Sequence, residues 1–431
     1  MYRIFLIIIL GYLSLLSVAA QKIKISEKEV ARIVRTLSSD EMQGRKTFTP
    51  GIAKASAFIQ DEFKKAGLKP LPGLNNYEQA FTMYRTEPVS LTVQLNGTTI
   101  LPENLLVSTS AEQLTWSNSS ANKPEIKNIS STDNFIQLAQ ALVNSPNNQL
   151  VLVDPAHVAT FKRFQAYLGR SNMKMERSNN ATIFVLTDQT EAKDYQVLAQ
   201  NKLTEQKINN VVGYLPGKTR PQEYVIFSAH YDHLGFVKAV NGDSIANGAD
   251  DDASGTTAVI TLARHFGKRK NERSIMFVAF AAEEIGGYGA RYFSQQLDPN
   301  QITAMFNIEM IGKESQFGKN AGFITGFERS DFGTIVQKNL AGTNYQFHPD
   351  PYVKENLFYR SDNATLARLG VPAHSLSTDK IDTDKLYHSV DDEFESLDIA
   401  NMTNIIKAIA KGAESIIAGQ DSPTRIAPAS R

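Results

Sequence analysis

Five short clusters of acidic residues and histidine stand out in the second half of the 431-residue chain. In the first, residues 228–233, His230 and Asp232 stand two residues apart after an apolar run. In an extended chain this spacing puts both side chains on one side, so the carboxylate can fix the tautomer of a metal-binding imidazole. A solvated loop that happens to carry a histidine is the simpler explanation of this motif taken alone.

Three consecutive aspartates, Asp250, Asp251 and Asp252, form the second cluster. Adjacent carboxylates repel one another unless they are solvated, lie at a helix N-terminus or are neutralised by a cation. The helix expected from Ser254 could favour two of them through its dipole while a metal binds the third. Helix capping without any metal explains the motif equally well.

Two adjacent glutamates, Glu283 and Glu284, follow the apolar segment 274–279. Two acids directly after a buried strand pack poorly. They suit a site in which one binds a metal and its neighbour acts as general base, then general acid, on water that the metal activates. The alternative is a solvated turn.

The last two clusters each offer one further ligand. Glu309 ends an otherwise apolar run, so it needs a metal or an arginine as partner unless the strand end reaches solvent. His388 lies in a polar segment in which Asp391 or Asp392 could orient its ring, and a solvated loop is again the alternative.

Oxygen and imidazole ligands without sulfur suit catalytic zinc, cobalt or manganese. The five clusters offer more ligands than one open zinc site uses, and two metals bridged by one carboxylate account for the surplus. The chain has no cysteine, which excludes thiol catalysis and a disulfide framework.

The segments around these clusters predict an α/β fold with a mixed, mostly parallel central sheet flanked by helices. Several clusters fall at or just after the carboxyl ends of predicted strands, where open α/β sheets bind ligands. The predicted strands are residues 224–229, 274–279, 304–308 and 373–377. The predicted helices are residues 254–266, 290–296, 332–340 and 364–369.

Towards the N-terminus, a helical pattern begins at Glu27, and a second helix is expected over residues 52–66. Residues 86–205 change character, with many Ser, Asn and Thr residues and short apolar runs. We interpret them as an inserted accessory subdomain, which could be a degenerate protease-associated unit, a lid or a surface elaboration. The expected divisions are a signal peptide (1–20), a catalytic domain in two parts (21–85 and 206–420), the insertion (86–205) and a flexible tail (421–431).

Composition limits the partners. The 45 basic and 45 acidic residues cancel without long runs of one sign, which argues against a nucleic-acid groove or a polybasic membrane patch. The first twenty residues combine Arg3, an apolar run and Ala19-Ala20, the layout of a signal peptide. We therefore expect a secreted or periplasmic protein with no stable membrane insertion after cleavage, and export without disulfides favours a bacterial setting.

The clusters, in this order, resemble the secreted bacterial two-zinc aminopeptidases of metallopeptidase family 28, of the leucyl aminopeptidase type. The resemblance rests on AHYDHLG (229–235), NGADDDASG (247–255), AAEEIGGYGA (281–290), NIEMIG (307–312) and YHSVDD (387–392). It extends to LSSDEMQGR (37–45) and NNVVGYLPGK (209–218).

The resemblance implies a zinc-exopeptidase fold, two zinc ions and a peptide substrate with a free N-terminus. Asp251 would bridge the metals and Glu283 would be the proton shuttle. Asp232 would support His230, and Tyr387 would help to stabilise the tetrahedral oxyanion. The implied ligands are His230 and Glu309 on one zinc and Glu284 and His388 on the other.

Two departures from the family pattern matter. The family commonly has Asp where Glu309 stands, so the longer side chain can shift one metal. Relatives often carry Ser-Asp-His where this chain has Ser361-Asp362-Asn363, so a substrate-side histidine is absent.

Three other functions stay open. A glutaminyl cyclase of the same fold would need only one zinc, whereas both ligand sets are complete here. A carboxypeptidase would need a basic residue facing the substrate carboxylate, and Arg291, Arg329 and Arg360 are candidates. A receptor-like binding protein that lost the chemistry would have lost ligands.

Overall fold

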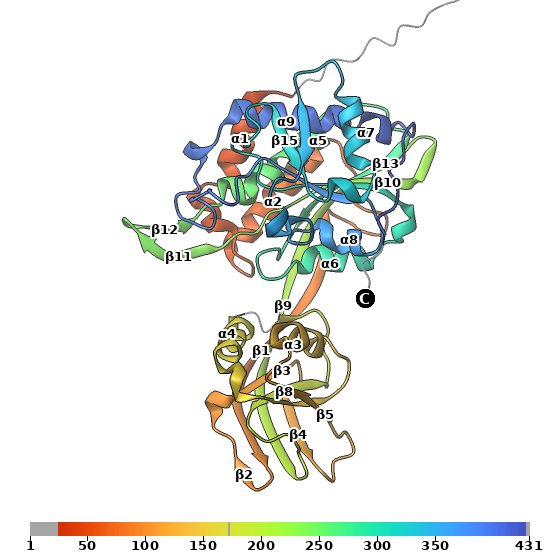
Figure 1. Ribbon diagram of the computed structural model, residues 1–431. Coiled ribbons are helices and arrows are strands. Elements are labelled where there is room, and N and C mark those ends of the chain that lie inside the picture. The colour runs from red at the N-terminus through yellow and green to blue at the C-terminus, as the bar shows by residue number, and fades with distance from the viewer. Residues whose placement is uncertain (1–24, 171–172, 428–431) are drawn as a thin grey trace, which may run out of the picture.

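The computed structural model describes residues 25–170 and 173–427 (Figure 1). The expected signal peptide, residues 1–20, lies outside the described residues. Among the helices that are described, none has both the length and the apolar composition needed to cross a membrane.

The predicted α/β fold, with a mixed and mostly parallel central sheet, is confirmed. Four strands in the order β13-β10-β14-β17 run parallel at the centre of the sheet. Strand β9 joins one side of this group antiparallel to β13, and β15 joins the other side antiparallel to β17. The central strands are β10 (Arg220–His230), β13 (Arg273–Phe280), β14 (Ile302–Ile308) and β17 (Ala373–Ser377). The flanking strands are β9 (Tyr195–Leu215), β1 (Glu78–Leu95), β2 (Thr98–Thr99), β15 (Ala321–Ile324) and β16 (Gln346–Pro349).

Successive residues of β10 point to opposite faces of the sheet, as the period of a strand requires. Phe227 and Ala229 belong to one buried cluster, and Ile226 belongs to the other. Helices therefore cover both faces and shield all four central strands from solvent. The first face is covered by α1 (Glu27–Leu37), α2 (Pro50–Lys65), α5 (Gly255–Phe266), α7 (Phe332–Asn339) and α9 (Ile399–Gly412). The second is covered by α6 (Tyr288–Gln295) and α8 (Asn363–Arg368), and the short α10 (Glu414–Ile417) follows α9.

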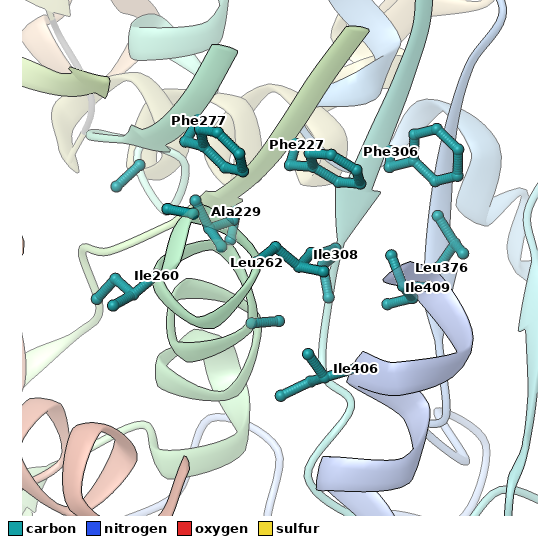
Figure 2. Close-up of a cluster of buried hydrophobic side chains, with 14 of the residues drawn as sticks. Phe227, Ala229, Ile260, Leu262, Phe277, Phe306, Ile308, Leu376, Ile406 and Ile409 are labelled. Carbon is teal, nitrogen blue, oxygen red and sulfur yellow. The ribbon is translucent and has the colours of Figure 1, made fainter. Parts of the chain in front are cut away.

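Aliphatic side chains and a row of aromatic rings fill the first of these two cores (Figure 2). The ring of Phe227 on β10 lies 5.6 Å from that of Phe277 on β13 and 5.1 Å from that of Phe306 on β14. Three of the four parallel strands each contribute one of these rings, so the layer helps to fix the register of strands that end at the candidate site.

The two predicted N-terminal helices are present. In α1 the buried residues Val30, Ile33, Val34 and Leu37 recur at helical spacing, with Glu27 and Glu29 in the first turn, where they complement the helix dipole. Helix α2 begins at Pro50 and ends before Gly67, whose φ of 78° suits glycine.

Strands β1 and β9 form a long antiparallel ribbon that leaves the central sheet and enters a second lobe, at the bottom of Figure 1. Arg85 and Thr204 are cross-strand partners on this ribbon. The chain therefore enters the second lobe and returns from it at neighbouring positions. The lobe has its own buried clusters around Trp116 and Phe161. Its elements are β3 (Leu105–Thr109), β4 (Gln113–Ser117), β5 (Glu125–Ile129), α3 (Phe135–Val143), β6 (Gln149–Val153), α4 (Val158–Arg170) and β8 (Ala181–Leu186). The short β7 (Met173–Lys174) pairs with β1 on the ribbon, and Met173 packs against the first core. The division into a catalytic domain and an inserted subdomain stays a prediction.

The expectation of a flexible tail from residue 421 is wrong for the part that the structure describes, up to residue 427. Arg273, buried at the start of β13, donates to the backbone oxygen of Asp421 and to Ser422. Thr424 is bonded to Asp331, and Ile426 is buried. A buried arginine needs acceptors, and this segment supplies them.

Candidate metal centre

The predicted clusters meet at the carboxyl ends of the central strands. His230 is the last residue of β10, Glu283 and Glu284 follow β13, and Glu309 follows β14. His388 comes from the loop after β17. Since parallel strands end at the same edge of a sheet, groups far apart in the sequence come together here.

Asp251 lies at the middle of two groups of side chains. Its Oδ1 is 3.2 Å from Nε2 of His230, and that nitrogen is also 3.2 Å from Oε1 of Glu309. Its Oδ2 is 3.2 Å from Nε2 of His388, which is also 3.2 Å from Oε2 of Glu284. The two carboxylate oxygens of Asp251 therefore face different groups, as the bridging ligand of two ions would.

These distances fit zinc. Ligand atoms about 2.0–2.1 Å from a tetrahedral zinc lie about 3.3 Å from one another. The donors are carboxylate oxygen and imidazole nitrogen, both of which zinc accepts. The site is also rich in negative charge: although burial opposes protonation, hydrogen bonds with Asp251 and Glu284 raise the pKa of His388 to about 10. A cation is what such a set of carboxylates favours.

His233 is a further member of the site that the sequence interpretation missed. It is buried, and its Nδ1 is 2.8 Å from Oε1 of Glu284 but 3.8 Å from Oδ2 of Asp251. The short contact is that of a hydrogen bond, so His233 orients Glu284 while the other oxygen of Glu284 faces His388. The signal was present in the sequence, since His233 lies three residues after His230.

Asp232 lies behind His230 as expected, but it acts through different atoms. Nδ1 of His230 is 3.1 Å from the backbone oxygen of Asp232 and 3.9 Å from its carboxylate. The backbone oxygen thus fixes the tautomer. The carboxylate accepts hydrogen bonds from the backbone N–H groups of Glu283 and Glu284, so it positions the glutamate pair. Burial raises its pKa to about 6.

The other two aspartates of the triplet have structural partners. Asp252 accepts from the N–H of Gly255 at the start of α5 and from the N–H of Met310. Asp250 accepts from the N–H of Gly312. Helix capping and a metal-facing carboxylate, the two explanations of this motif, therefore both find support in the geometry.

The expectation that Asp391 or Asp392 orients His388 is wrong. The carboxylate of Asp392 accepts from the N–H groups of Asp250 and Asp251, so it holds the aspartate loop instead. Asp391 is exposed. The ring of His388 stacks on that of Tyr387, with centroids 3.9 Å apart.

Arg45, from the motif LSSDEMQGR, joins the loops that carry the site. It is fully buried and donates to the backbone oxygens of Leu37, Tyr231, Asn247 and Gly248 at 2.5–2.9 Å. The motif therefore holds loops of the site in place, although it lies about 200 residues away from them in the sequence. No local sequence pattern reveals this role.

Ser361 is the second missed residue, because its Oγ donates to Oε2 of Glu309 at 2.6 Å. Asn363, which stands where relatives often carry histidine, is buried and bonded to the backbone oxygens of Phe358 and Ala373. It lies in the interior, among the partners that hold α8 on the sheet. Both carboxylate oxygens of the buried Asp362 lack a hydrogen-bond donor among the described residues.

An open cavity leads to the two groups. Glu283 and Tyr387 both line it, beside the ligand candidates. Burial raises the pKa of Glu283 well above its usual range, and the carboxylates of Asp362, Glu309 and Glu284 add to this effect.

Three strained backbone positions lie at the same place. Ala282, Met310 and His388 have φ values of 64°, 50° and 56°, in the left-handed region that non-glycine residues rarely adopt. Each is a candidate site residue or directly adjoins one. Strained backbone of this kind clusters at functional sites, where it is part of how side chains are aimed.

Comparison with known proteins agrees with this location. Residues 210–413 match the family model described as Peptidase family M28. A probable zinc metalloprotease of Leptosphaeria maculans is 34% identical over 111 residues, 25% of this chain and 26% of that protein. Aminopeptidase YwaD of Bacillus subtilis is 30% identical over 131 residues, 30% of this chain and 26% of that protein. The chain thus spans about a quarter of the length of these curated relatives.

The similarity to solved structures extends over the whole fold. A zinc aminopeptidase from Bacillus subtilis covers 93% of this chain and 98% of its own, with a TM-score of 0.55 and 15% identity. An aminopeptidase from an Aneurinibacillus strain covers 94% and 97%, with a TM-score of 0.52 and 15% identity. At these identities the comparison establishes the fold.

Proposed function

We propose, on the premise that residues 210–413 are a zinc metallopeptidase segment of family M28, that this protein is an aminopeptidase with two zinc ions. The observation that carries the proposal is the orientation of Asp251, whose two oxygens face two separate ligand groups. The named activities of similar proteins, a zinc metalloprotease and aminopeptidases, support the same reaction class.

The ligand assignment follows the geometry. His230 and Glu309 would hold one ion, Glu284 and His388 the other, and Asp251 both. Cobalt or manganese could replace zinc on this donor set. Zinc supplies Lewis acidity to such a site, because it polarises a carbonyl oxygen and lowers the pKa of water.

Glu283 is the proposed general base. It lines the cavity beside both ligand groups, and its backbone N–H is tied to Asp232, so its position is fixed by the strand end. A carboxylate there can take a proton from attacking water and then deliver it to the leaving amine. Tyr387 also lines the cavity and is the proposed donor to the oxyanion.

The test uses substrates that differ only at the amine. Purified protein loaded with zinc should hydrolyse a leucyl or lysyl anilide with a free α-amine, and not the N-acetylated forms. Free glutamine and N-terminal glutaminyl peptides test the cyclase alternative in the same panel. Hydrolysis restricted to blocked-amine substrates, or cyclisation without hydrolysis, would refute the proposal.

A carboxypeptidase remains the second candidate because of one observation. Of the three arginines considered from the sequence, Arg360 lines the cavity, whereas Arg291 and Arg329 lie over aromatic rings. Arg360 is exposed and 3.4 Å from Glu355, which already neutralises it. Peptides blocked at the N-terminus and free at the C-terminus distinguish this activity from aminopeptidase action.

The place of action is also part of the proposal. The segment 1–20, with its signal-peptide layout, supports export to the periplasm or the medium. Immunoblotting of fractionated cells, with the N-terminus of the mature protein sequenced, would test both the export and the cleavage.

A further inference from the structure

Asp379 is a buried acid at the cavity that leads to the metal centre, and its side-chain hydrogen-bond partner is another acid, Asp384. It is 4% exposed, and among the described residues neither of its carboxylate oxygens accepts a hydrogen bond from a donor. It nevertheless lines the same cavity as His230 and Glu283. A buried carboxylate without a donor is costly in free energy, and most buried polar groups are paired. Asp379 therefore needs an explanation that the metal ligands do not supply.

The buried cluster behind Asp379 contains more carboxylates than cations. Asp250 and Asp384 each place a carboxylate oxygen within 4.8 Å of one on Asp379. The cation in this group is Lys313, whose Nζ is 2.6 Å from Asp384 and 3.3 Å from Asp250, and also 3.9 Å from Asp392. One lysine thus faces several carboxylates, and no ion pair between Lys313 and Asp379 is found in the described part of the chain. Burial, the charges of Asp250 and Asp384 and the side-chain hydrogen bond with Asp384 raise the pKa of Asp379 to about 8.

The walls of the cavity have a different character. Met310, Phe323, Leu357 and Ile381 line it together with small hydroxyl residues. Apart from the residues of the metal centre, its charged lining groups are Asp379 and Arg360, and Arg360 is about half exposed and paired with Glu355. An unbranched chain of methylene groups suits such walls, and a cationic end would give Asp379 a positively charged partner.

We propose that this cavity binds the side chain of the substrate's N-terminal residue and that Asp379 selects lysine and arginine there. The inference rests on the proposed aminopeptidase function and adds its substrate class. On arrival of a cationic side chain, Asp379 gains a partner of opposite charge, which a neutral chain of equal length does not supply. Discrimination against an analogue that lacks the bonded group is strong at sites of this kind.

The experiment compares substrates matched in length. For the zinc-loaded wild-type protein, kcat/KM for the lysyl anilide should exceed that for the norleucyl anilide by at least about tenfold, and arginyl should exceed citrullyl similarly. In Asp379→Asn the lysyl-to-norleucyl ratio should fall about tenfold or more. Asp382→Asn is the control, since it removes a charge from an exposed residue three positions along the same loop and should keep the wild-type ratio.

The outcomes distinguish a failure of the proposed aminopeptidase function from a failure of the proposed selectivity. If no free-amine substrate is hydrolysed by the wild-type protein, the proposed function itself fails. If norleucyl substrate is hydrolysed as well as lysyl substrate, the aminopeptidase stands and the selectivity is refuted. If Asp379→Asn lowers kcat/KM for all substrates equally, Asp379 meets the α-amine or supports the fold, which also overturns the inference.

Two further measurements keep the inference testable should Asp379→Asn fold poorly. Free L-lysine should inhibit the wild-type protein at a concentration at least about tenfold lower than L-norleucine. Metal analysis should find the same number of ions per chain in the wild type and in Asp379→Asn. A third ion that is lost in Asp379→Asn would show that the carboxylate serves a metal instead of a side chain.

Discussion

Glu309 is held from two sides, since Oε1 faces His230 and Oε2 accepts from Ser361 at 2.6 Å. The sequence interpretation singled out this glutamate because relatives commonly have Asp at its position. The serine compensates for the longer side chain by fixing the oxygen that does not face the ligand group. Partners of this kind orient metal ligands, and their loss weakens metal binding and activity.

Ser361→Ala should therefore raise the zinc dissociation constant roughly tenfold and lower kcat/KM, with little change in stability. Competition with a chelator of known affinity measures the first effect. Ser131→Ala, an exposed serine outside the site, should change neither quantity. Unchanged zinc affinity in Ser361→Ala would show that the Glu309–Ser361 contact does not support the ligand.

His374 should make stability depend on pH. It is fully buried, its ring nitrogens lie 2.8 Å from the backbone oxygen of Thr325 and from Oγ of Ser330, and burial lowers its pKa from 6.5 to about 4. The unfolded chain takes up a proton below pH 6.5 that the native ring does not. The stabilisation by the neutral ring is therefore complete above pH 6.5 and is lost as the pH falls towards 4, by up to about 3 kcal/mol.

Urea unfolding at pH 7 and pH 4.5, with EDTA present to remove metal effects, should show a smaller drop for His374→Gln than for the wild type. The difference between the two proteins isolates His374 from the other titrating groups. Equal drops in both proteins would contradict the assignment.

Arg45 is the residue on which the arrangement of several elements depends. It links the end of α1 to the loop after β10 and to the aspartate loop before α5. Arg45→Met removes the guanidinium that donates to four buried backbone oxygens, so the free energy of unfolding should fall by about 3 kcal/mol or more.

Arg85→Met, at a half-exposed arginine on β1, is the control and should change stability by less than about 0.5 kcal/mol. Chemical denaturation followed by circular dichroism measures both variants. A loss in Arg45→Met no larger than in Arg85→Met would refute the role of Arg45.

The helices and strands around the site were largely predictable from the sequence, because local sequence signals determine them. Strand 373–377 and the helix that follows Ser254 match β17 and α5, because apolar runs and helix-start signals act within a few residues. What the sequence did not reveal was carried by long-range contacts. The donors to Glu284 and Glu309, His233 and Ser361, are 51 and 52 residues away from them.

At the scale of the whole molecule, the ribbon of β1 and β9 separates two lobes with their own buried clusters. The pairing of Arg85 with Thr204 brings the ends of the intervening segment together. A two-residue Asn-Gly turn can connect such partners directly. A chain in which this turn replaces residues 86–203 should fold with a single cooperative transition and still bind zinc.

Thermal unfolding and metal analysis of the shortened protein would test this prediction. Kinetics with short and long peptides would then show whether the second lobe restricts access to the cavity. A shortened chain that does not fold would show that the second lobe is part of the core, contrary to the predicted insertion.

The central claim is that Glu283 carries the proton while five other residues hold two metals, and one variant tests it most directly. Glu283→Gln keeps the size of the side chain and removes its basicity, so turnover of a free-amine substrate should fall by at least about 100-fold. Metal analysis of the same preparation should still find two zinc ions per chain, as in the wild type. Substantial turnover in Glu283→Gln, or loss of metal together with activity, would contradict the account.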